Sequence, residues 1–155
     1  MRMTVWARGR RAGAPVVVAL SLALVSACGG ADSSAEGEPA ARPTCMASLE
    51  AVTVPKDGSF PTDWPFPPDT VVTSTEKVPG GGLAVTAQVG STFEEVLPFM
   101  QHDLEDAGFV ATEGEAEHDD AEATWTGGGY SGTWAIKSSA SCEGTTLLQM
   151  AAAKQ

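Results

Sequence analysis

The sequence predicts an α+β domain in which an antiparallel sheet of about five to six strands packs one helix against one face. Three observations predict it: apolar residues that alternate along several short runs, glycine-rich turns between those runs, and one amphipathic helical stretch. The expected order along the chain is β-β-α-β-β-β-β. This domain is expected over residues 45–155, after a signal peptide at 1–27 and a flexible linker at 28–44.

The first strands are expected at residues 70–78 and 82–90, on either side of the turn sequence Pro79-Gly80-Gly81. Every second residue of the second run is apolar, which is typical of a strand with one buried face. These residues are Leu83, Val85, Ala87 and Val89. A hairpin follows from the two runs and the turn between them.

The helix is expected over residues 91–108. Ser91 is the predicted N-cap, and Glu94, three residues later, completes a capping box. Pro98 lies inside the helix and is expected to kink it rather than end it, because the apolar stripe continues past the proline. The stripe at helical spacing consists of Phe93, Val96, Leu97, Met100, Leu104 and Ala107.

Three further strands are expected at residues 109–137 and a last one at 144–153. Gly128-Gly129 is a strong hairpin signal, because glycine accepts the positive φ of a two-residue turn. This turn places large side chains against small ones, so both tryptophans of the hairpin are predicted core residues. The predicted pairs are Trp125 with Gly132, Ala123 with Trp134, and Ala121 with Ile136.

A proline-rich stretch at residues 60–69, FPTDWPFPPD, precedes the first strand. Four prolines in ten residues exclude a helix and a central strand. Its aromatic residues favour an extended segment that docks on the domain. Polyproline peptides that bind aromatic-lined partners have a similar composition.

The N-terminus has the pattern of a secretory signal peptide. Arg2, Arg8, Arg10 and Arg11 precede an apolar run over residues 14–27 that is too short for a comfortable membrane span. The run ends in Val25-Ser26-Ala27-Cys28, which resembles a bacterial lipobox. This resemblance implies a lipid on the Cys28 thiol and attachment to the extracytoplasmic side of the cell membrane; the alternative is ordinary cleavage after Ala27.

After residue 27 the chain carries five basic and twenty acidic residues. This balance argues against a nucleic-acid partner, whose phosphates require a basic surface. It also argues against a domain that lies flat on anionic lipid headgroups. The expected membrane contact is therefore the lipid anchor alone.

No pattern of residues identifies a catalytic or cofactor site, and none is expected. His102, Asp103 and Asp106 on the helix could make only a poor metal site, so a solvated helix face is favoured. Glu113, Glu115 and Glu117 are expected on one face of a strand, as a charged edge that discourages strand addition. Glu113 and Glu115, together with an acid on a neighbouring strand, could also serve a glycosidase, which uses paired carboxylates.

Four stretches resemble small actinobacterial lipoproteins and secreted proteins of uncharacterised function. They are PPDTVV, VPGGGLAVTA, EDAGFVAT and TGGGYSGTW, between residues 67 and 134. The resemblance implies the fold and the location and contributes no catalytic residue.

Cys45 and Cys142 remain once Cys28 carries lipid. An even pair in an oxidising compartment predicts a disulfide between them. Two functions stay open. The first is a non-enzymatic module that binds an envelope protein, a polymer or a small apolar ligand, and the second is a cell-envelope hydrolase with paired carboxylates.

Overall fold

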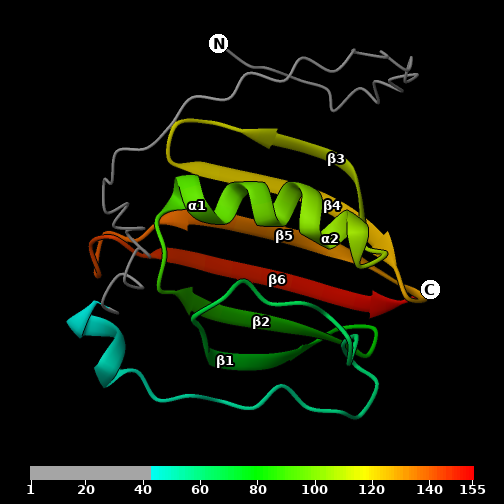
Figure 1. Cartoon of the computed structure of the whole chain (residues 1–155). Coiled ribbons are helices and arrows are strands. Elements are labelled where there is room, and N and C mark those ends of the chain that lie inside the picture. The colour runs from blue at the N-terminus through cyan, green and yellow to red at the C-terminus, as the bar shows by residue number, and fades with distance from the viewer. Residues whose placement is uncertain (1–42) are drawn as a thin grey trace, which may run out of the picture. The chain divides into compact units, whose positions relative to one another are not determined.

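Six antiparallel strands form a single sheet in the computed structural model, which describes residues 43–155 (Figure 1). The strands are β1 (Thr70–Val78), β2 (Gly82–Val89), β3 (Val110–Ala116), β4 (Asp120–Gly127), β5 (Tyr130–Ser138) and β6 (Thr146–Lys154). Their order in the sheet is β1-β2-β6-β5-β4-β3, so the last strand lies between the first hairpin and the others. The coarse α+β prediction is confirmed. A short 3-10 helix, η1 (Thr44–Ser48), precedes the strands and was not expected.

One helical segment connects β2 to β3 and lies against one face of the sheet (Figure 1). It consists of α1 (Phe93–Pro98), a π-helical stretch η2 (Phe99–Asp103) and α2 (Leu104–Asp106). Because β2 and β3 run in the same direction at separate places in the sheet, the chain must cross over between them, and a helix is the usual crossover.

The helix begins one residue later than predicted. Thr92, not Ser91, is the N-cap, and Thr92 forms the capping box with Glu95. The backbone N–H of Thr92 donates to Oε2 of Glu95 at 3.0 Å. Ser91 and Thr92 are each followed by a glutamate three residues later, so the sequence pattern fits both. The carbonyl oxygen of Ser91 instead accepts a hydrogen bond from the hydroxyl of Thr146 in β6.

Pro98 does not end the helix, as predicted. Its backbone keeps helical angles, and the next five residues widen into the π-helical stretch, in which the N–H of Leu104 donates to the carbonyl of Phe99. The apolar stripe faces the sheet as expected except at its last member, Ala107, which is exposed because the helix ends at Asp106. The fully buried members are Phe93, Val96, Met100 and Leu104.

The register of the β4–β5 hairpin agrees with the prediction at every pair. Gly128 and Gly129 form its turn with φ angles of 58° and 81°. The pairs are Trp125 with Gly132, Ala123 with Trp134, and Ala121 with Ile136. Trp125 and Trp134 are 1% and 2% exposed, so both belong to the core.

The core lies between the helix-side face of the sheet, the helix and the segment that enters the domain. The ring of Trp64 lies 4.8 Å from that of Phe109 and 4.6 Å from that of Trp125. The indole N–H groups of Trp64, Trp125 and Trp134 are buried and have no hydrogen-bond partner in the described part of the chain. Each such group costs roughly 1–3 kcal/mol, and burial of the large rings offsets this cost.

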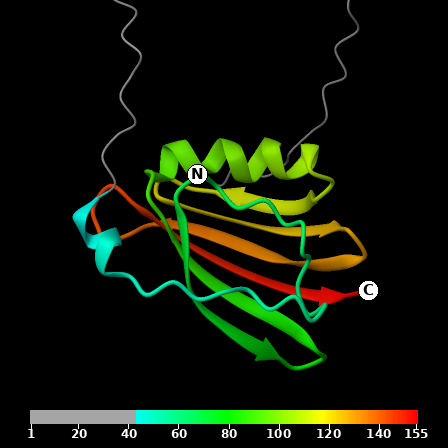
Figure 2. The same ribbon diagram turned by 60° about the horizontal axis from the view of Figure 1, so that its bottom comes forward.

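The entry segment, residues 49–69, runs past β1 and then returns beside the helix (Figure 2). Phe60 and Trp64 are 1% and 5% exposed, so the predicted docking of the proline-rich stretch is confirmed. The hydroxyl of Tyr130 donates to the carbonyl oxygen of Gly58 at 3.0 Å. The segment therefore completes the core beside the helix.

Asp57 joins the entry segment to β1. Its carboxylate accepts hydrogen bonds from the hydroxyl and the backbone N–H of Ser59, and lies 3.3 Å from Nζ of Lys77. The hydrogen bonds from Ser59, followed by the contact with Lys77, lower the pKa of Asp57 to about 2. The carboxylate is thus charged at any ordinary pH.

Candidate functional site

The two faces of the sheet differ sharply in composition. Along β4, buried Ala121, Ala123 and Trp125 alternate with exposed Glu122 and Thr124. Because successive side chains of a strand point to opposite faces, the apolar residues face the helix and the polar ones face away from it. The same alternation of burial continues in β5 and β6, so in these strands the helix-side face is buried and apolar, and the opposite face is more exposed and more polar.

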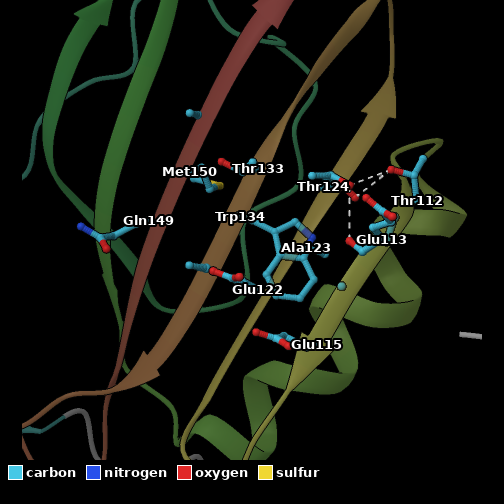
Figure 3. A pocket seen from close by; sticks show the side chains of 14 residues that line it. Thr112, Glu113, Glu115, Glu122, Ala123, Thr124, Thr133, Trp134, Gln149 and Met150 are labelled. Atoms are coloured by element: carbon cyan, nitrogen blue, oxygen red, sulfur yellow. Dashed lines mark hydrogen bonds between the residues drawn. The ribbon is translucent and has the colours of Figure 1, made fainter. Parts of the chain in front are cut away.

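We call the polar face, opposite the helix, the open face. In the described part of the chain, no helix or strand packs against it (Figure 2). It is hollowed over β3, β4, β5 and β6 into a cavity of about 780 Å³. The side chains that alternation places on it are Glu113, Glu115, Glu122, Thr124, Thr133, Ala135, Gln149 and Ala151 (Figure 3).

Small side chains form the floor of this cavity. Thr124 lies opposite Thr133, and Thr133 lies opposite Ala151, so a row of hydroxyl and methyl groups crosses three strands. Next to this row, Glu122 pairs with Ala135, and Ala135 pairs with Gln149. No aromatic side chain is directed onto this floor, because Trp134, which lines the cavity through its strand, belongs to the helix-side face.

Three glutamates, Glu113, Glu115 and Glu122, stand at one side of the floor, and we call them the acidic group. Glu115 lies directly opposite Glu122 across the β3–β4 pair, and Glu113 lies two residues before Glu115. All three side chains are exposed. The predicted third member of the row, Glu117, lies beyond the end of β3 at Ala116 and is not part of the cavity lining.

A bulge positions the acidic group on the edge strand. The β3–β4 register shifts between Ala111 and Glu113, so Thr112 is an extra residue. Its hydroxyl lies 2.8 Å from the Thr124 hydroxyl (Figure 3). The bulge therefore ties the edge strand to β4 at the rim of the cavity. The predicted edge position of this strand is confirmed.

A second, smaller cavity of about 330 Å³ lies between the helix and the end of the entry segment. Pro67 and Pro68 line one side, and Glu95, His102 and Asp103 are among the residues on the other. Within residues 43–155, no three histidine, cysteine or acidic side chains converge as metal ligands. His102, Asp103 and Asp106 are exposed, and the first two lie at this second cavity.

Two of the three cysteines considered in the sequence are brought together. Cys45 and Cys142 form a disulfide with their Cα atoms 5.8 Å apart, as predicted. Cys142 is 7% exposed, and its carbonyl oxygen accepts a hydrogen bond from the buried hydroxyl of Thr145. Cys28, the predicted lipidation site, lies outside the described residues. No described helix is long and apolar enough to cross a membrane.

The floor of the open face was missed as a site by sequence reasoning. The signal lay in the β4–β5 register, which sets Glu122, Thr124 and Thr126 against Ala135, Thr133 and Ser131. In a sequence, a strand face that carries small polar residues and no large apolar residue is typical of an ordinary solvated surface. The hollow becomes visible only when four twisted strands are assembled.

Comparison with known proteins gave no significant match to a family model, to a curated protein or to a solved structure.

Proposed function

We propose that the protein is a lipid-anchored extracytoplasmic lipoprotein whose folded domain binds a partner, without catalysis, through the open face. The observation that carries the binding role is the cavity of about 780 Å³ on a sheet face that no described element covers. The basic residues and the apolar run at the N-terminus, followed directly by Cys28, support the lipid anchor. The Cys45–Cys142 disulfide is compatible with an oxidising compartment.

The composition of the cavity favours a polar partner over a small apolar ligand. Pockets for small ligands are lined mainly by hydrophobic and aromatic side chains. Here the open-face side chains that line the cavity are threonine, alanine, glutamine and glutamate. An envelope protein or polymer that presents polar groups is the partner class that we infer.

A cell-envelope hydrolase is the second candidate, and the Glu115–Glu122 pair favours it. Directly opposite residues of antiparallel strands have Cβ atoms about 4.5–5.5 Å apart, and paired glycosidase carboxyl groups lie roughly 5–10 Å apart. Both glutamates are exposed on an open sheet rather than on two walls of a groove. We therefore place binding first.

Site-directed photo-cross-linking tests the binding role. A photoreactive residue replaces Thr133 on the open face or, as a control, Ala107 at the end of the helix; both are exposed. In cells that export and lipidate the full chain, we expect a discrete adduct from position 133 and none from position 107. Absence of an adduct at 133, or the same adduct at both positions, would contradict the proposal.

The anchor has its own test. Cys28→Ala removes the only thiol at the end of the signal peptide, so we expect unprocessed precursor and loss of the mature protein from the detergent phase after phase separation. Ser26→Ala is the matched control, because it keeps a small residue next to the cysteine, and it should leave processing unchanged. Normal partitioning of the Cys28→Ala protein would rule out the lipid anchor.

A further inference from the structure

We propose that the open face binds an extended basic polypeptide segment of a partner protein, whose lysine or arginine side chains pair with Glu113, Glu115 and Glu122. This inference rests on the proposed function, because it names the partner of the same face. Three features of the cavity support it: the negative charge of the acidic group, the small side chains of the floor, and the exposure of the acidic group to solvent.

The charge of the acidic group is not compensated within the domain. Glu115 and Glu122 are like charges in directly opposite positions, an arrangement that destabilises a sheet. No ion pair among residues 43–155 involves any member of the acidic group. Lys137, the lysine on the open face, lies opposite Asp120, two residues before Glu122 in β4, but forms no ion pair with the acidic group. A cationic partner would relieve the repulsion that the isolated domain tolerates.

The floor suits the long side chains of basic residues. Lysine and arginine bury aliphatic stems along apolar or small groups while the charged head stays in water or on a carboxylate. Thr124, Thr133 and Ala135 offer methyl groups on the floor beside the acidic group. Nucleic acid is excluded by the negative charge, and the floor lacks the aromatic ring on which a sugar would stack.

The exposure of the acidic group favours a polypeptide over a small cation. A drug-sized ligand is held by burial of most of its surface, but Glu113, Glu115 and Glu122 are all exposed. A single exposed ion pair is weak, so useful affinity requires several charges on one connected chain. A basic segment that crosses β3 and β4 can engage all three glutamates together.

The test measures binding of a fluorescently labelled octalysine peptide to the full chain at low salt, by anisotropy. The site variant is Glu113→Gln/Glu115→Gln/Glu122→Gln. The control, Glu50→Gln/Glu94→Gln/Glu143→Gln, removes the same charge from exposed positions outside the cavity. We expect the site variant to bind at least ten-fold more weakly than the wild type, and the control to bind within about two-fold of it. The six substituted positions are exposed, so both variants should fold, which their thermal melts would check.

Equal weakening in the two variants would mean non-specific attraction to an acidic domain and would overturn the inference. Spermidine that binds as tightly as the peptide would also overturn it, since a small cation would then suffice. The cross-link from position 133 separates this inference from the proposed function. If the adduct forms equally well in the site variant, the open face binds a partner by other contacts, and only the basic segment is wrong.

Discussion

Replacing Gly132 by valine is expected to lower the free energy of unfolding by about 3 kcal/mol or more, the upper end of the usual cost of overpacking. A Cβ at this position would collide with the carbonyl oxygen of Ala151 in β6 and lie 2.9 Å from Cζ2 of Trp125. Backbone in the middle of a sheet cannot move aside as a flexible side chain can. The register alone predicts contact with the Trp125 ring, and the β6 carbonyl makes the expected loss larger.

Thr133→Val is the matched control for this substitution. Thr133 is the next residue of β5 and is exposed on the open face, so the change should stay within about 0.5 kcal/mol of the wild type. Urea denaturation followed by tryptophan fluorescence measures both. Equal losses at positions 132 and 133 would mean that Gly132 is not pressed against β6 and the core.

Removal of the disulfide by Cys45→Ala/Cys142→Ala is expected to cost about 2–4 kcal/mol of stability. The two cysteines are 97 residues apart in sequence, so the bond closes a loop that includes most of the domain. In the chain-entropy model, closing a loop of this length stabilises the folded protein by up to about 4.7 kcal/mol, and measured stabilisations are usually smaller. Urea denaturation of the soluble domain should show this loss of stability.

Dithiothreitol provides the control. It should lower the unfolding midpoint of the wild type to that of the double variant and leave the double variant unchanged. Mass spectrometry after alkylation without reduction should find neither Cys45 nor Cys142 modified in the wild type. Two alkylated thiols in oxidised wild-type protein, together with a midpoint that does not respond to dithiothreitol, would contradict the disulfide.

Local patterns were sufficient to predict the β4–β5 hairpin. Gly128-Gly129 fixed the turn, and each large side chain then met a small one on one face only, so a shift by one residue would have spoiled both faces. The helix cap was less well determined, because Ser91 and Thr92 both fit the capping pattern. The structure selects Thr92, since the backbone of Ser91 is engaged by Thr146 of a distant strand.

The order of strands and the acidic group depend on long-range pairing that local patterns do not contain. Nothing near residues 144–153 indicates that β6 pairs with β2, about 60 residues earlier. Likewise, Glu115 meets Glu122 only because the bulge at Thr112 resets the β3–β4 register. The sequence marked Glu113 and Glu115 as a charged edge, which they are, but their place beside a hollow floor required the assembled sheet.

The central position of β6 sets the order in which this domain can be completed. β6 pairs with β2 on one side and with β5 on the other, yet it is the last strand to be synthesised. Until residues 146–154 appear, the strands of a nascent chain can therefore pair only as two separate groups, β1–β2 and β3–β4–β5, each with an unpaired edge where β6 belongs. Cys142 arrives just ahead of β6, so the covalent link to Cys45 can close as the two halves join. The complete sheet can therefore form only after nearly all of the domain has been synthesised.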